Sequence, residues 1–147
     1  MNDCLLPRRR AFTLVEILIV VVILGILAAI VVPQFARATS DTQRAAVADQ
    51  VNKIRHILAV YYVRSGNRLP NITAGDGTWG ELIAPGSSYM RNPPKNPWVG
   101  GANASVIAIG NAPDSAFQTT HGWIFDPDTG DIWAGGCDGQ DNPLPRP

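Results

Sequence analysis

Residues 8–33 read RRRAFTLVEILIVVVILGILAAIVVP, and this stretch decides how the chain is organised. Eighteen of the 22 positions from Phe12 to Pro33 are apolar, and Glu16 is the only charged residue among them. A helix over 12–32 would be roughly 31 Å long at about 1.5 Å per residue, which is enough to span the core of a bilayer. Three arginines precede it directly, so the positive-inside rule predicts a cytoplasmic amino terminus and a remainder outside.

Three kinds of membrane-targeting segment fit this pattern. A secretory signal peptide would be cut at Ala36-Arg37-Ala38, but the apolar run exceeds the usual roughly 7–15 residues and has Glu16 inside it. A plain uncleaved anchor gives the position of Glu16 no reason. An ionisable group within a membrane segment indicates a function with a definite partner, and the third kind of segment supplies one.

The string from Arg10 to Glu16, followed by the long apolar run, resembles the prepilin processing site of type IV pilins and type II secretion pseudopilins. The resemblance implies that a prepilin peptidase cuts between Ala11 and Phe12, after which Phe12 is N-methylated. It also implies that Glu16 pairs with the amine of Phe12 on a neighbouring subunit during assembly. The chain departs from the family at Ala11, where glycine is usual. Without an assembly role, Glu16 would lie at the cytoplasmic interface and reach water there.

The helix is expected to continue beyond the membrane. Pro33 removes one backbone hydrogen bond, which predicts a kink and not necessarily a stop. Gly25 and Pro33 fall where pilin-like helices carry them, and Gly25 with Ala29 would let two helices approach closely in lipid. Gly66 is a suitable helix stop, so we expect one helix from about Phe12 to Ser65.

The second part of this helix is predicted to be amphipathic. An apolar seam steps by four, three, four and three residues through Val47, Val51, Ile54, Leu58 and Tyr61. Residues 34–69 hold six basic side chains against two acidic ones, a net charge of +4. Those charges are spread around the helix, which favours a solvated face or contacts with acidic neighbours and not nucleic-acid binding.

The carboxy-terminal part is rich in turns and acidic. From Pro70 onward lie 22 of the 26 Gly and Pro residues, and three basic residues stand against eight acids. The run 105–109 reads as a strand, and 122–125 with 132–134 as a hairpin around the turn 126–131. A small antiparallel sheet on the helix seam predicts an α+β, pilin-like fold. The expected parts are a leader (1–11), a transmembrane helix half (12–33), an amphipathic half (34–66) and a β-sheet domain (67–147).

Two further segments resemble the major pseudopilin of type II secretion. Residues 89–98 resemble its loop ending in Pro-Lys-Asp-Pro-Trp-Gly, and 137–140 resemble its Gly-Ala-Asp-Gly-Gln stretch. The hairpin 125–133 looks more like that of minor or generic pilin-like proteins. Cys4 would leave with the leader, so Cys137 remains an odd thiol and the two-cysteine loop of many type IV pilins is absent. This favours a pseudopilin.

The resemblance also implies a calcium site, because major pseudopilins bind calcium in their carboxy-terminal region. Ca²⁺ takes six to eight oxygen ligands, among them carboxylates. The spacing of the acids does not match an EF-hand, and they could simply form turns. The candidate ligands are Asp126, Asp128, Asp131, Asp138 and Asp141.

Nothing in the sequence points to an enzyme, because no HExxH, P-loop, G-x-S-x-G or C-x-x-C motif occurs. His56 and His121 are expected to be ordinary residues. The four tryptophans are predicted to pack in the core, with a carbohydrate- or protein-binding face as the alternative. They are Trp79, Trp98, Trp123 and Trp133.

The sequence therefore predicts a structural subunit of a pilus-like filament, most consistent with a type II secretion pseudopilin that drives protein export. The expected partners are further copies of the subunit, minor pseudopilins, the prepilin peptidase and the inner-membrane assembly platform. The subunit would start in the inner membrane with its carboxy-terminal domain in the periplasm, and then enter a periplasmic or cell-surface filament. Two alternatives stay open: a type IV pilus subunit for adhesion, motility or DNA uptake, and a membrane-tethered binding domain that never polymerises.

Overall fold

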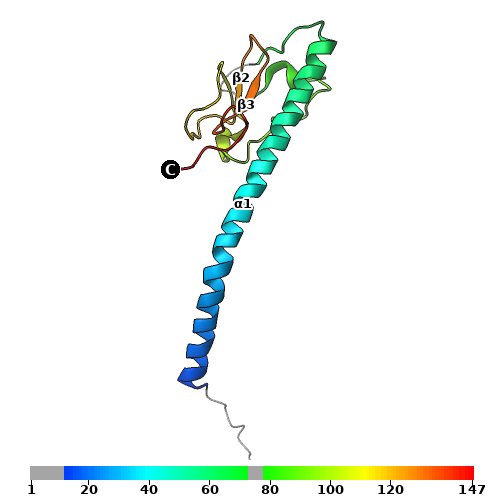
Figure 1. Cartoon of the computed structure of the whole chain (residues 1–147). Helices are drawn as coiled ribbons and strands as arrows, with labels where there is room; N and C mark the ends of the chain where they lie inside the picture. Colours follow the sequence, from blue (N-terminus) through cyan, green and yellow to red (C-terminus); the bar gives the residue numbers. More distant parts are fainter. Residues whose placement is uncertain (1–11, 73–77) are drawn as a thin grey trace, which may run out of the picture. The chain divides into compact units, whose positions relative to one another are not determined.

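The computed structural model of the chain describes residues 12–72 and 78–147 (Figure 1). Contacts within it divide the chain into two compact units, Met1–Thr39 and Ser40–Pro147. The second unit, named the head below, holds two short 3-10 helices and three short strands beside the last part of one long helix. The finer boundaries at residues 33 and 66 stay predictions.

The long helix, α1 (Leu14–Arg64), continues through both Gly25 and Pro33, as predicted. It begins with a capping box, in which Thr13 Oγ1 accepts a hydrogen bond from Glu16 N at 3.2 Å. It ends at a glycine: Gly66 has φ +71°, and Asn67 N donates to Tyr62 O at 2.9 Å. This bond is the mark of a Schellman cap, so the predicted stop at Gly66 is confirmed.

The predicted seam of α1 forms one wall of the head's core. Its five residues, 47, 51, 54, 58 and 61, are each at most 5% exposed. Against them pack apolar side chains from the rest of the head, with Trp79 and Trp123 meeting edge to face at a centroid distance of 6.0 Å. Since full burial of one such side chain stabilises a fold by about 1.5–3 kcal/mol, the seam accounts for the packing of the last part of α1 against the rest of the head.

The sheet of the head is mixed, which corrects the predicted antiparallel sheet. Strand β2 (Trp123–Phe125) pairs antiparallel with β3 (Ile132–Ala134), as expected for the hairpin. Strand β1 (Ile107–Ile109) pairs with β2 in parallel. The reason is the connection 110–122, which returns the chain to the end of the sheet where β1 started before β2 begins. The α+β class itself is confirmed.

Two 3-10 helices, η1 (Gly80–Leu82) and η2 (Ala102–Ser105), complete the regular structure of the described residues. The hairpin turn is shaped by the nearly buried Asp126, whose Oδ1 accepts hydrogen bonds from Asp128 N at 2.8 Å and Thr129 N at 3.3 Å. These bonds to its charged form lower the pKa of Asp126, and Gly130 closes the turn with φ +82°.

Candidate functional site

The start of α1 presents the two residues of the predicted processing and assembly site that the structure describes. Phe12 is 79% exposed. Thr13 holds the Glu16 carboxylate through its backbone N–H at 2.8 Å and its hydroxyl at 2.9 Å, both reaching Oε2. Ala11, on the other side of the predicted cut, lies outside the described residues. Cleavage, methylation and the assembly role of Glu16 stay predictions.

The first part of α1 is apolar on all sides. An 18-residue window of it has a mean hydropathy of 3.3, and none of that window is buried within the chain. The large apolar side chains from Ile17 to Val32 are 42–65% exposed. A methyl group added at Gly25 would meet nothing within 4 Å. Nothing in the described residues 12–72 and 78–147 therefore explains this glycine, which agrees with a packing role toward another helix.

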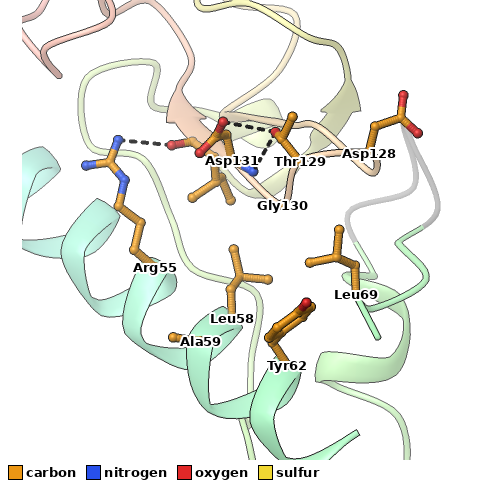
Figure 2. A pocket seen from close by; sticks show the side chains of 10 residues that line it. Arg55, Leu58, Ala59, Tyr62, Leu69, Asp128, Thr129, Gly130 and Asp131 are labelled. Carbon is orange, nitrogen blue, oxygen red and sulfur yellow. Dashed lines mark hydrogen bonds between the residues drawn. The ribbon is translucent and has the colours of Figure 1, made fainter. Parts of the chain in front are cut away.

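The head carries a groove between α1 and the hairpin turn, shown in Figure 2. Its volume is about 400 Å³. The floor is apolar and includes Leu58, Ala59, Tyr62 and Leu69, while the rim carries acidic side chains of the turn between β2 and β3. The ten lining residues are Arg55, Leu58, Ala59, Tyr62, Leu69, Asp128, Thr129, Gly130, Asp131 and Ile132.

A hydrogen-bonded network fastens the chain where it leaves α1. The Glu81 carboxylate accepts two bonds from Arg68 at 3.0 Å and one from the Tyr61 hydroxyl at 2.6 Å. It also accepts the backbone N–H of Asn71 at 2.9 Å. The Arg68 and Tyr61 bonds are the largest causes that lower the pKa of Glu81 from 4.5 to about 2. The same contacts raise the pKa of Arg68, while burial is the first cause of the raised pKa of Tyr61.

A second ion pair ties the carboxy-terminal loop to α1. Arg55 donates to both carboxylate oxygens of Asp141, at 2.6 and 3.1 Å. The same guanidinium donates to the carbonyl of Ile132 at 3.1 Å. Arg55 therefore joins three segments of the head, namely α1, β3 and the loop at 138–142.

The five predicted calcium ligands do not converge in the described part of the chain, where no group of three or more Asp, Glu, His or Cys side chains suits a metal ion. Asp126 shapes the hairpin turn, and Asp141 is paired with Arg55. Asp138 accepts the backbone N–H groups of Gln140 and Asn142, and these bonds lower its pKa. Calcium binding by these residues stays a prediction of the resemblance.

The remaining candidate residues are mostly structural. Trp79, Trp98 and Trp123 belong to the core, as predicted, while Trp133 is partly exposed. Cys137 is buried, and burial followed by the nearby carboxylates raises its pKa to about 12. His121 is half-buried, with Nε2 at 3.5 Å from Asp114 Oδ2, and His56 is exposed.

Sequence reasoning missed the residue that braces the loop 93–99. Asn96 is fully buried, and its amide nitrogen donates to the carbonyls of Gly122 at 2.8 Å and Gly135 at 2.9 Å. Its side-chain oxygen accepts the backbone N–H groups of Trp98 and Val99. An asparagine between two prolines reads as a loop residue, so only its place in the segment resembling the pseudopilin loop hinted at importance.

Known proteins resemble this chain in both of its units. Residues 6–32 match the family model described as the prokaryotic N-terminal methylation motif. Together with the apolar helix, this motif indicates a single-pass membrane anchor. No solved structure matches the chain.

Similarity to curated proteins extends into the head. The type II secretion system core protein G of Klebsiella pneumoniae is 30% identical over 115 residues, which are 71% of this chain and 79% of that protein. The protein of the same name from Klebsiella michiganensis is 28% identical over 141 residues, 89% of this chain and 85% of its own length. The one from Pectobacterium carotovorum subsp. carotovorum is 30% identical over 102 residues, and the chain spans 63% of its length. The chain therefore belongs to the type II secretion system core protein G family, the major pseudopilins.

Proposed function

We propose that this chain is the structural subunit of a helical pilus-like filament that drives protein export in type II secretion. One observation carries the proposal: an anchor helix that follows Phe12 and carries Glu16 near its start, whose apolar side chains from Ile17 to Val32 are not buried by any described part of the chain. Such a helix needs either lipid or other helices around it, and a filament core provides the helices once the subunit leaves the membrane. The role is mechanical, so catalysis by this chain is no part of it.

Maturation would precede assembly. The subunit would insert with its amino terminus in the cytoplasm and its head in the periplasm, consistent with the arginines before Phe12. Prepilin peptidase would cut between Ala11 and Phe12, and methylation would follow at the new amino terminus. The inner-membrane assembly platform and the minor pseudopilins are the further partners that the proposal needs.

Glu16 would supply the attraction that registers each new subunit. A carboxylate in lipid costs up to about 2.5–3.5 kcal/mol at a helix centre, and less near an end. The positive amine of a neighbour's Phe12 would remove that cost by forming an ion pair. Thr13 already orients Oε2 through two hydrogen bonds, which leaves the other carboxylate oxygen available for the pair.

The resulting contacts would be head-to-tail, because the amine of one copy would meet the carboxylate of the next. Head-to-tail contacts that do not close into a ring generate open helical filaments. The charge distribution fits, since a basic helix segment over 34–69 and an acidic remainder can attract each other between copies.

The test replaces Glu16 in cells that carry a type II secretion system. Glu16→Gln should leave membrane insertion intact and lower the yield of sheared filaments by at least about tenfold, the effect of losing about 1.4 kcal/mol per contact. Asp49→Asn is the matched control, because it removes an exposed acid whose pair with Lys53 is worth little.

Sequencing the mature amino terminus distinguishes the alternatives. A methylated Phe12 supports the proposal, whereas a mature chain starting at Thr39 indicates signal peptidase and ends it. Normal insertion with no filament from the wild-type chain would favour a tethered binding domain. Filaments that support twitching, adhesion or DNA uptake but not export would favour a type IV pilus subunit.

A further inference from the structure

The groove between α1 and the hairpin turn has two acidic side chains on its rim. Asp128 and Asp131 are both exposed there, and Figure 2 shows them on the turn above the apolar floor. Asp131 accepts a hydrogen bond from the Thr129 hydroxyl at 2.9 Å. Neither carboxylate has a cationic partner among the described residues, since Arg55, the one base lining the groove, is paired with Asp141.

The floor of the same groove combines aliphatic surface with an aromatic ring. Tyr62 lines it and is 40% exposed, and Leu58, Ala59 and Leu69 line the same groove (Figure 2). Aromatic-floored grooves with acidic rims suit short proline-containing segments that carry basic side chains, because the stiff prolines lose little entropy on binding. The groove therefore has a recognisable complement in chemical terms.

That complement occurs in this chain, in the loop RNPPK over residues 91–95. Arg91 and Lys95 are exposed and have no carboxylate partner in the part of the chain that the structure describes. Pro93 and Pro94 stand between them and fix the backbone. The loop is also held from below, because Trp123 Nε1 donates to the carbonyl of Pro94 at 2.9 Å.

We propose that the loop 91–95 of one copy docks into this groove of a neighbouring copy. Arg91 and Lys95 then pair with Asp128 and Asp131, and the two prolines lie on the ring of Tyr62. A second copy is the occupant because each head carries both complementary surfaces, and among the described residues neither surface has an oppositely charged partner within the same head. Two different surfaces meet in this contact, the loop of one head and the groove of the next, so it can repeat along a filament. The inference rests on the proposed function and adds a contact between heads to the one between the helices.

Charge reversal tests the pairing in the full-length chain, in the same filament assay. The double variants Asp128→Lys/Asp131→Lys and Arg91→Glu/Lys95→Glu should each lower filament yield at least about tenfold, as close charge pairs across interfaces do. Combining all four reversals should restore the yield to within about threefold of wild type. Ser115→Lys/Ala116→Lys, which adds two cations to an exposed part of the head, is the control and should assemble normally.

Crosslinking provides a readout that does not depend on yield. A short bismaleimide should join Lys95→Cys/Asp128→Cys subunits into a ladder of dimers, trimers and longer chains within filaments. The control pair Lys95→Cys/Ser115→Cys should not form the ladder. Cys137 does not interfere, since it is buried within the core.

The outcomes separate this contact from the filament itself. If wild-type subunits do not polymerise, the proposed function fails and this contact fails with it. If they polymerise while the charge-reversed variants do so equally well, or if filaments give no ladder, only the contact between loop and groove is overturned. A four-fold variant that assembles no better than its parents also overturns it.

Discussion

The two parts of α1 differ in where their apolar side chains find contacts. From Ile17 to Val32 every large apolar side chain stays exposed in the single chain, whereas the seam from Val47 to Tyr61 is buried within the head. The first part is apolar on every side, whereas the second carries charged side chains among its apolar ones and buries the seam that recurs every third or fourth position. A continuous apolar surface thus calls for partners outside the chain, and a narrow seam is satisfied by partners inside it.

Because of this difference, the stability of the head and the assembly of the subunit can be changed independently by substitutions in the two parts of α1. Contacts inside the head set its stability against unfolding. In the proposed function, contacts made by the first part of α1 set insertion and assembly. All four tryptophans lie in the head, so their fluorescence in detergent micelles reports unfolding of the head alone.

The largest expected difference between the two parts comes from substituting one isoleucine in each of them. Ile54→Ala should lower the free energy of unfolding of the head by about 2–5 kcal/mol, because it opens a cavity in a packed core. Ile23→Ala removes the same atoms from an exposed position and should change that free energy by no more than about 0.5 kcal/mol. Chemical denaturation of the full chain in micelles measures both.

In the filament assay the order of the two effects should reverse, so that Ile23→Ala lowers the filament yield more than Ile54→Ala does. Ile23→Ala should do so without unfolding the head. If Ile23→Ala destabilised the head as much as Ile54→Ala, the division of α1 into an outward and an inward part would be wrong.

A second experiment tests the contacts that stabilise the inside of the head. Asn96→Ala should lower the free energy of unfolding by about 2–4 kcal/mol, because it leaves the buried carbonyl of Gly135 and the buried N–H groups of Trp98 and Val99 without the Asn96 side chain as their partner. The carbonyl of Gly122 loses one of its two bonds and keeps the one from Gly135 N at 2.8 Å. Asn103→Ala is the matched control, since that exposed amide makes one bond, to the carbonyl of Thr119. A loss below about 1 kcal/mol for Asn96→Ala, equal to a single ordinary hydrogen bond, would show that water replaces these bonds.

Local patterns predicted the parts of the fold that neighbouring residues decide. The seam of α1, its stop at Gly66 and the hairpin at 126–131 each follow from spacing or turn chemistry within a few residues. The mixed sheet did not follow, because the direction of β1 relative to β2 depends on the path of the connection 110–122. Turn-rich segments carry no periodic signal for such a path.

The candidate site divides in the same way. The processing and assembly residues stand in one continuous motif and were predictable, although the structure of a single chain leaves their roles as predictions. The pair of Arg55 with Asp141 joins residues 86 positions apart, so no spacing rule announces it. The same pair shows that acids close in sequence need not share one metal ion, because the carboxylate of Asp141 is paired with the guanidinium of Arg55.

A pH titration tests the network at the end of α1. The folded pKa of Glu81, about 2, lies below its ordinary 4.5, so its contribution to stability is complete above pH 4.5. That contribution is lost as the pH falls from about 4.5 toward 2, where the carboxylate takes up a proton. Melting of the head should therefore shift to lower temperature over this window, and Glu81→Gln should flatten the shift. An equal shift in the variant would assign the acid sensitivity to other carboxylates.

The smallest expected effect concerns calcium. The experiment tests whether a bound ion can stabilise the head, as partners outside the chain are proposed to stabilise the first part of α1. In the wild-type head Arg55 occupies both oxygens of Asp141, so calcium should raise the melting temperature little. Arg55→Gln frees that carboxylate near Asp138, and calcium should then stabilise the variant more than the wild type, because carboxylates are preferred ligands. Melting with and without millimolar calcium, with magnesium as the control, measures the difference. A larger calcium shift in the wild type than in Arg55→Gln would mean that the ion pair supports a calcium site and does not compete with one.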